Sequence, residues 1–342
     1  MNRKIFKPLA LLAVTCAVAA ACAQETTKST GEKAKEYLEL FLQKYYPYVT
    51  PNEYGIFVLE ETPGTGKAWN PDSSYIYAHY TIRTLSGTIS TTTDETLSKQ
   101  LGTYALGNYY GPRFQATGEN ISYAGVDALF TGMRMGGMRK AIVPAWLLTT
   151  SRFSTTKEYL DACSTSTHLE YTVTIFSQTG DITRTEKDSL SRYVKSYYPG
   201  QKPVSFTDDD PDSTFYFVSD SSAFVGTSKI PTDTTLRLNY TGKLLNGQVF
   251  DTTLERVAKD AGIYNAARTY EPQSITVTSD YKSITMGGSS SLITGFKAGI
   301  GKMKWVGQKA VILFTSTHGY ATDGSGQTIP PYSPLIFELE ML

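Results

Sequence analysis

The sequence predicts an α+β protein built from two related, strand-rich domains. At 342 residues the chain is long enough for about two ordinary domains. Its apolar runs are short and bounded by turn residues, and they contain much tyrosine and threonine, which is typical of strands. One run, LRLNYTGKLLNGQVFD at residues 236–251, alternates apolar and polar residues and turns at Asn246-Gly247. A related run, IYAHYTIRTLSGTIST, lies at residues 76–91 and indicates an internal repeat.

The repeat includes a helix and a strand ahead of each run. Each helical segment carries apolar residues four apart on one face and stops at a proline. The helices are expected over residues 32–46 and 185–198, and the aromatic strands that follow them over 54–61 and 215–220. The order helix, strand, hairpin therefore occurs twice. It predicts one domain over residues 31–180 and a second over residues 181–342.

The N-terminus has the pattern of an export signal over residues 1–22. Basic residues precede an apolar run that is too short to span a bilayer. The run VAAAC at residues 18–22 resembles a bacterial lipobox, in which Cys22 becomes the lipidated first residue, with residues 23–30 as a polar tether. Alternatively, Ala21-Cys22-Ala23 is an A-x-A cleavage site, and the mature protein is soluble in the periplasm or secreted. We favour a lipoprotein anchored to a membrane of the bacterial cell envelope.

Composition argues against several classes of function. The formal net charge is zero, which disfavours a nucleic-acid partner because such binding needs a clustered basic face. Only Cys163 lies in the body of the chain, and the three histidines are far apart, so no metal or other cofactor is expected. The run TDDDPDS at residues 207–213 lacks the spacing of a calcium loop and is predicted to be a solvated loop.

Three blocks of the second repeat resemble one known family. They are NYTGKLLNGQVFD (239–251), SLITGFKAGIGKMKWVGQKAVILF (291–314) and HGYATDGSGQTIPPYSPLIFELEML (318–342). In this order they resemble the FK506-binding-protein (FKBP) type of peptidyl-prolyl cis-trans isomerase, over most of residues 215–342. The gap after Asp251 is longer than that family needs, so residues 254–280 are interpreted as an insertion close to the site.

The resemblance implies an antiparallel sheet curled around one short helix in each domain. The residues agree independently, since 236–240, 310–314 and 335–341 have strand patterns and 296–303 has a brief helical pattern. A sheet buries its concave face only against another element, and this helix is the only candidate.

The resemblance also implies a site made of apolar and aromatic residues. The catalytic positions carried over are Tyr240, Phe250, Asp251, Ile293 and Tyr320, and the substrate-binding positions are Leu292, Phe296, Ile329 and Phe337. Phe296 stands where the family usually has tryptophan, and Ala321 stands where it usually has glycine. Rotation of an X–Pro bond needs no metal or nucleophile, because an apolar pocket that strips water from the carbonyl disfavours the planar amide.

Within this site the resemblance assigns different roles to the polar groups. The backbone N–H of Ile293 and the hydroxyl of Tyr320 would donate to the carbonyl in the twisted state. Asp251 would orient polar groups through Tyr240.

The first repeat keeps the scaffold pattern but loses these residues. It retains Tyr80, but it has Ser90-Thr91 where the second has Phe250-Asp251, and Val126 where the second has Phe296. Its last strand is expected over residues 168–176. We therefore expect a degenerate FKBP-like domain without isomerase activity, whose role would be packing, dimerisation or client binding.

The predicted function is a peptidyl-prolyl isomerase of the cell envelope that assists the folding of exported, proline-containing polypeptides. Isomerisation is slow enough to limit folding, so such an enzyme is useful where clients arrive unfolded. The alternative is a non-catalytic FKBP-fold chaperone or binding lipoprotein. Carbohydrate binding is a third possibility, supported only by the abundance of tyrosine.

Overall fold

The computed structural model describes residues 28–118, 121–207, 210–219, 228–278 and 283–342. The predicted signal peptide, Cys22 and most of the predicted tether lie outside these ranges. Within them, no helix has the length and apolar character needed to cross a membrane.

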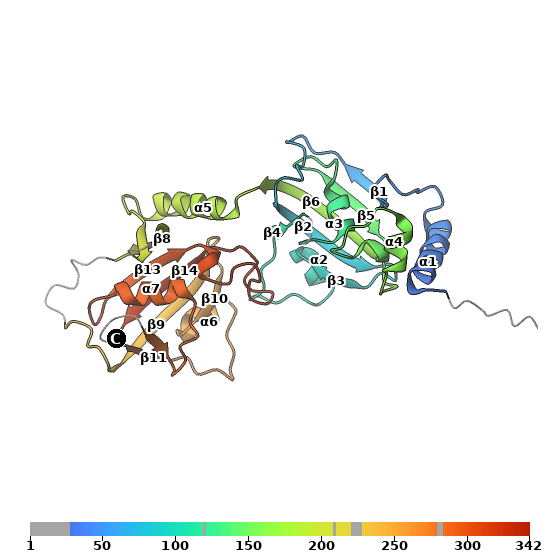
Figure 1. The fold of residues 1–342 in the computed structure, drawn as a ribbon. Coiled ribbons are helices and arrows are strands. Elements are labelled where there is room, and N and C mark those ends of the chain that lie inside the picture. The colour runs from blue at the N-terminus through green and yellow to red at the C-terminus, as the bar shows by residue number, and fades with distance from the viewer. Residues whose placement is uncertain (1–27, 119–120, 208–209, 220–227, 279–282) are drawn as a thin grey trace, which may run out of the picture.

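Both predicted amphipathic helices are confirmed. Helix α1 spans Thr30–Tyr45 and begins with a capping box, in which the Ser29 side chain accepts from the N–H of Glu32. It buries Leu38 and Leu42 and ends before Pro47. Helix α5 spans Ile182–Tyr197, is capped by Asp181, and buries Leu190 and Val194. Figure 1 shows α1 at the outer side of the first domain, beside α4, and α5 running from the first sheet across the second.

The first domain is an antiparallel sheet with short helices. Its strands are β1 (Phe57–Thr62), β2 (Tyr75–Thr84), β3 (Ile89–Thr92), β4 (Arg113–Ala116), β5 (Met138–Val143) and β6 (Leu169–Thr179). Their order across the sheet is β1-β5-β6-β2-β3, and β4 also pairs with β2. The remaining helices are α2 (Glu95–Gln100), α3 (Ala124–Phe130), the 3-10 turn η1 (Ala145–Leu147) and α4 (Thr156–Asp161).

The second domain repeats this plan. Its strands are β7 (Val204–Thr207), β8 (Asp210–Val218), β9 (Thr235–Leu244), β10 (Val249–Thr252), β11 (Gln273–Val277), β12 (Ile284–Met286), β13 (Lys309–Phe314) and β14 (Leu335–Met341). They lie in the order β12-β11-β9-β14-β13-β8-β7, and β10 also pairs with β9. Its helices are α6 (Glu255–Asp260), α7 (Thr294–Lys302) and the 3-10 turn η3 (Ser316–His318).

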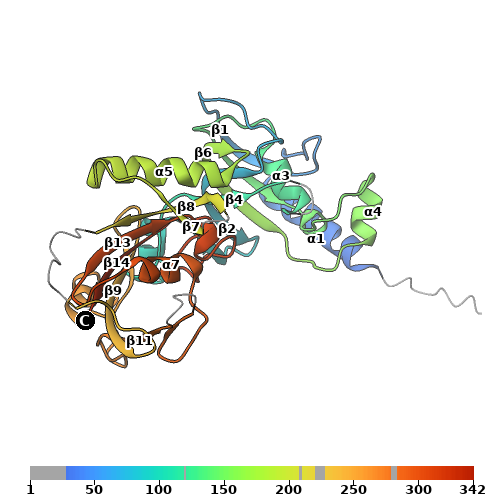
Figure 2. The same cartoon turned by 60° about the vertical axis from the view of Figure 1, so that its left-hand side comes forward.

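The two sheets share a common set of strands, which confirms the α+β fold of two related antiparallel domains, and among the described residues β7 and β12 are found in the second sheet alone. The order β1-β5-β6-β2 in the first domain corresponds to β8-β13-β14-β9 in the second. In Figure 2, α3 lies against the first sheet as α7 lies against the second. The close approach of α7 to β13 depends on Gly295, because a Cβ there would overlap the ring of Phe314. Each domain has its own buried core.

One expectation for the second domain needs correction. The run 207–213 was expected to be a loop, yet β7 ends at Thr207 and β8 begins at Asp210. The pairing of these two strands imposes extended structure on polar residues, and positions 208–209 lie outside the described residues. The segment 254–280, which was interpreted as an insertion with its structure left open, contains α6 and β11 among its described residues, and β11 pairs with β9. The first domain has the same two elements as α2 and β4.

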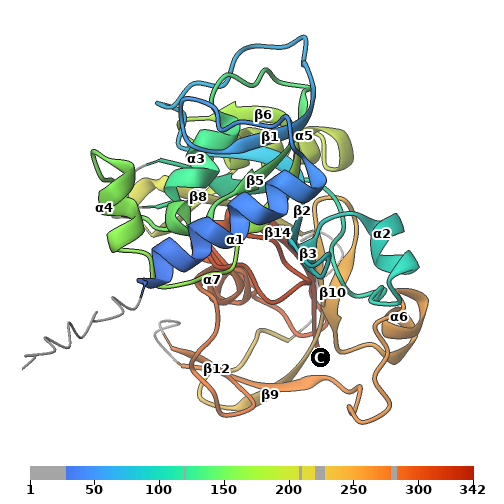
Figure 3. The ribbon, with the colours of Figure 1, turned by 90° about the vertical axis from the view of Figure 1, so that its right-hand side faces the viewer.

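The loop after α2 contacts the second domain at two places. The N–H of Tyr109 donates to the carbonyl of Gln327 at 2.8 Å, and Gln248 Nε2 donates to the carbonyl of Gly107 at 3.1 Å. Tyr109 also packs on the core of the second domain. Figure 3 views this side, with α2 and α6 near one another.

Candidate active site

Four aromatic rings form a cradle on the concave face of the second sheet. Strand β9 supplies Tyr240, β10 supplies Phe250, α7 supplies Phe296 and β14 supplies Phe337. Phe337 lies at the centre, with its ring centroid 4.9 Å from that of Phe296, 5.5 Å from Phe250 and 6.3 Å from Tyr240. Tyr240, Phe296 and Phe337 are buried and Phe250 is half-buried. We call these four residues the aromatic cradle.

Gly242 allows the cradle to form. It lies on β9 directly opposite Phe337 of β14. A Cβ at this position would overlap the ring of Phe250 and come within 3.0 Å of Phe337 Cε1. Glycine is unfavourable in a strand interior and often marks a close approach. Here it makes room for two rings.

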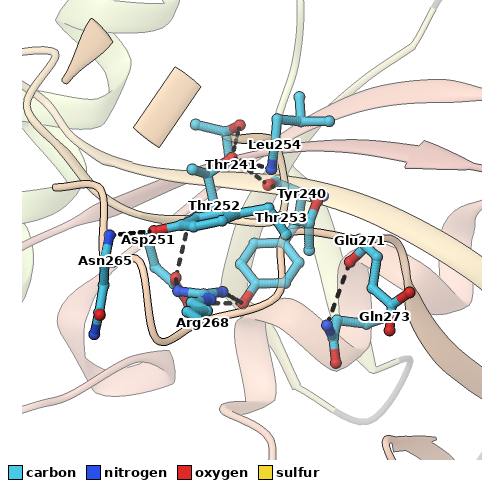
Figure 4. Close-up of polar contacts among 11 residues, drawn as sticks. Tyr240, Thr241, Asp251, Thr252, Thr253, Leu254, Asn265, Arg268, Glu271 and Gln273 are labelled. Atoms are coloured by element: carbon cyan, nitrogen blue, oxygen red, sulfur yellow. Dashed lines mark hydrogen bonds and ion pairs between the residues drawn. The ribbon is translucent and has the colours of Figure 1, made fainter. Parts of the chain in front are cut away.

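A polar triad of Tyr240, Asp251 and Arg268 closes one side of the cradle. Tyr240 Oη donates to Asp251 Oδ2 at 2.6 Å, and Asp251 Oδ1 pairs with Arg268 Nη1 (Figure 4). Arg268 Nη2 is 3.5 Å from Tyr240 Oη. Burial, followed by the neighbouring Asp251, raises the pKa of Tyr240, so its phenol remains a donor.

Arg268 was missed by the sequence reasoning. It lies in the loop after α6, and its guanidinium stands over the ring of Tyr270, 5.3 Å from the centroid. The ring of Tyr270 stacks in turn on Tyr264. A half-buried carboxylate such as that of Asp251 is normally paired with a cation. The segment offered several basic residues, however, and nothing in the spacing distinguished Arg268 from Arg256 or Lys259.

Three of the remaining predicted site residues pack in this core, and the fourth, Tyr320, is linked to Asp251. Leu292 and Ile293 pack against it from the start of α7, and Ile329 is buried in it. Ile293 is the N-cap residue of α7, so its N–H is among those without a partner inside the helix. Tyr320 is 36 % exposed, and burial together with the charge of Asp251 raises its pKa. The structure thus gathers all nine residues, whereas their individual roles stay predictions.

The loop that carries Tyr320 and Ile329 is held from behind by Glu186 of α5. The carboxylate accepts from Ser316 N at 2.5 Å and from Ser316 Oγ at 2.7 Å. Ser316 O in turn accepts from the N–H of Ala321 at 2.8 Å. Glu186 is 3 % exposed, and burial raises its pKa from 4.5 to about 7, with the Ser316 hydrogen bonds acting in the opposite direction. This contact fixes the start of the loop against the helix.

We expect Arg268→Gln to lower kcat/KM for proline isomerisation by about 3- to 10-fold, because Asp251 loses a charged partner and orients Tyr240 less well. The matched control is Arg256→Gln, whose side chain is 93 % exposed on α6 and forms an ion pair with Asp260. It should leave the rate unchanged. Equal rates for both variants would show that Arg268 is not part of the site.

Ala321 has a left-handed backbone with φ of +45°. This conformation is strained for alanine and relaxed for glycine. We expect Ala321→Gly to raise the free energy of unfolding by about 0.5–1 kcal/mol in urea denaturation. The control Ala298→Gly, within α7, should lower it. A loss of stability in both variants would contradict the assignment of strain to Ala321.

The site contains no cluster suited to a metal. Among the described residues, no group of three or more histidine, cysteine, aspartate or glutamate side chains gathers to hold an ion. The arrangement instead offers an apolar surface of four aromatic rings. It can hold a proline ring and stabilise a twisted amide.

Comparison with known proteins assigns this site to a family. The family profile described as FKBP-type peptidyl-prolyl cis-trans isomerase matches residues 226–342. The FK506-binding protein of Neisseria meningitidis serogroup B is 34 % identical over 107 residues, which are 31 % of this chain and 76 % of that protein. A peptidyl-prolyl cis-trans isomerase of Schizosaccharomyces pombe is 31 % identical over 107 residues, 31 % of this chain and 74 % of that protein.

The chain belongs to the FKBP-type peptidyl-prolyl cis-trans isomerase family. It is an enzyme that isomerises the peptide bond before proline. Among solved structures, FkpA from Escherichia coli is similar with a TM-score of 0.31 and 21 % identity, covering 47 % of this chain and 59 % of that one.

Proposed function

We propose that the protein isomerises X–Pro bonds in polypeptides exported to the bacterial cell envelope, with the second domain as the catalytic unit. The observation that supports this most is the aromatic cradle, closed by the triad of Tyr240, Asp251 and Arg268. In the first domain, Ser90 and Thr91 occupy the positions of Phe250 and Asp251.

The cradle lowers the barrier by binding the twisted amide better than the planar one. The planar amide resists rotation with a barrier of roughly 18–20 kcal/mol. Inside an apolar cradle the polar planar form loses hydration, and the twisted form loses less because it is less dipolar. The N–H of Ile293, the N-cap residue of α7, and the hydroxyl of Tyr320, whose pKa the charge of Asp251 helps to raise, are the proposed donors for the turning carbonyl.

The first domain has no isomerase activity of its own in this proposal. It keeps Tyr80 but has no aromatic residue or carboxylate at positions 90–91. Val126 of α3 stands at the position that corresponds to Phe296 of α7. Ile82 of β2 stands at the position that corresponds to Gly242 of β9. An isoleucine there fills the space that the cradle leaves open for two rings.

The role in folding is tested with an unfolded reference protein whose refolding is limited by X–Pro isomerisation. The full chain should accelerate the slow refolding phase, and Asp251→Asn should reduce this acceleration. A chain that suppresses aggregation while leaving the slow phase unchanged would indicate a holding chaperone instead.

The cellular location is supported by the sequence around Cys22. Cells expressing the full chain, fed a clickable palmitate analogue, should yield labelled protein in the membrane fraction. Cys22→Ser should abolish both the label and the membrane association. Unlabelled wild-type protein in the soluble periplasmic fraction would support cleavage at the A-x-A site and rule out the anchor.

A further inference from the structure

The first domain contains a cavity of about 380 Å3 between α3 and the strands β2, β4 and β6. It is distinct from the aromatic cradle, which belongs to the second domain. Its walls include Val126 and Leu129 of α3 and Ile82 of β2. The volume is within the usual range for sites that hold small ligands or peptide side chains.

Strand register places this cavity at the position that the cradle occupies in the second domain. Ile82 lies opposite Tyr171 across β2 and β6, as Gly242 lies opposite Phe337 across β9 and β14. Tyr123 is the N-cap residue of α3, as Ile293 is of α7. The fold therefore retains a concave site in the domain that has lost the catalytic residues.

The polar groups of the cavity are neutral hydrogen-bonding groups. Three phenols line it, those of Tyr80, Tyr123 and Tyr171, and Gln115 Nε2 donates to Tyr80 Oη at 3.4 Å. Burial, followed by the neighbouring Tyr123 and Tyr80, raises the pKa of Tyr171, which keeps its phenol protonated. Among the described residues lining the cavity, none is acidic or basic. A charged ligand would find no partner here, whereas an amide carbonyl would find several donors.

We propose that this cavity is a second, non-catalytic binding site for an extended, uncharged X–Pro segment of the client polypeptide. The phenols donate to backbone carbonyls, and Val126 and Ile82, which are only half-buried, contact the proline ring. An X–Pro unit suits such a lining because it offers a carbonyl acceptor and an apolar ring but lacks the proline N–H. The proposal rests on the proposed function, in that the clients are proline-containing polypeptides.

The cavity would bind without catalysing because its walls lack the residues that the cradle has at three corresponding positions. Thr91 lines it where Asp251 orients Tyr240 in the second domain, and Ser90 replaces the ring of Phe250. The side chain of Ile82 stands where Gly242 admits that ring. A site lined by phenols and without the aromatic ring and carboxylate of the cradle holds planar and twisted amides alike, and uniform binding does not accelerate rotation.

The second site would assist catalysis because it lies in the same chain as the cradle. A client held by the first domain presents its other X–Pro bonds to the cradle at a high effective concentration. The loop 101–112 of the first domain already touches the loop of Gln327 beside the cradle. The effect should thus appear with long unfolded clients and be absent with short peptides.

The experiment uses the full chain carrying Phe250→Ser and Asp251→Thr, so that only the first-domain cavity can respond. A blocked four-residue peptide with a central leucyl-proline bond is titrated against methyl NMR signals of Ile82, Val126 and Leu129. A second peptide, with alanine in place of proline, is the matched ligand control. Tyr171→Phe removes one donor at nearly constant shape, and Val126→Trp fills the cavity.

We expect saturable shifts of these methyl signals with the proline peptide and weaker binding of the alanine peptide. Tyr171→Phe should weaken binding by about 5- to 10-fold, the effect of one hydrogen bond, and Val126→Trp should abolish it. Unmoved methyl signals, or equal affinity for both peptides, would overturn the proposal.

A separate assay keeps failure of this proposal distinct from failure of the proposed function. With an otherwise wild-type chain, Val126→Trp should leave isomerisation of the short peptide unchanged while lowering catalysis on an unfolded protein. If both rates are unchanged, the cavity takes no part in client binding. If the wild-type chain isomerises neither substrate, the proposed function itself fails.

Discussion

Gly242→Ile is expected to lower kcat/KM for proline isomerisation by about 100-fold. A side chain at position 242 would overlap the ring of Phe250 and crowd Phe337, so the cradle cannot close around the proline ring. Such overpacking should also lower the free energy of unfolding by about 1–3 kcal/mol. The rate is measured on the full chain with a short X–Pro peptide, at a temperature where circular dichroism shows the variant folded.

The matched control is Ile82→Gly, the converse exchange at the corresponding position of β2. It should destabilise the first domain but leave the isomerisation of the short peptide unchanged. Wild-type activity in folded Gly242→Ile would show that the cradle is not the catalytic surface.

Above neutral pH, Glu186→Gln is expected to raise the free energy of unfolding relative to the wild type. It should also remove the part of the pH dependence of stability that Glu186 causes. Burial raises the pKa of Glu186 from 4.5 to about 7, so the folded state binds this proton more tightly than the unfolded state. Stability from this group is fully present below pH 4.5 and is lost as the pH rises through 7. The loss amounts to at most about 3 kcal/mol.

Glutamine at position 186 can accept from Ser316 N and donate to Ser316 Oγ, so both contacts of the helix with the loop persist. In urea denaturation at pH 4.5, 6 and 8, the free energy of unfolding of the variant should increase relative to that of the wild type as the pH rises. Asp188→Asn, at an exposed position on the same helix, should show no such gain. A constant difference across this range would contradict the assignment to Glu186.

The regular elements were predictable because their patterns are local. The apolar residues four apart in 32–46 and 185–198 correspond to α1 and α5. The alternation in 236–251 corresponds to β9 and β10 with their turn. The nine predicted site residues lie together because the resemblance supplied long-range information that periodicity lacks.

What the sequence reasoning missed depends on contacts between distant residues. Arg268 pairs with a carboxylate 17 positions away through a loop whose path no pattern specifies. Glu186 was not singled out in the sequence, yet it is buried against Ser316, which lies 130 positions further along the chain.

The first domain makes the corresponding contact with different chemistry. His168 Nδ1 accepts from Ala145 N, while His168 Nε2 binds the carbonyl of Ala34 on α1. The repeated fold thus preserves a contact between the helix and the 3-10 turn, while the residue that makes it has moved from the helix to a strand end. Comparison of the two repeats by residue type alone could not find it.

The central claim is that catalysis belongs to the second domain alone. The most direct test measures isomerisation of a short X–Pro peptide by the full chain carrying Phe250→Ser and Asp251→Thr, the residues that the first domain has at 90 and 91. We predict that the rate falls to that of the uncatalysed reaction while the chain stays folded. A rate near that of the wild type would contradict the account and place the activity elsewhere in the chain.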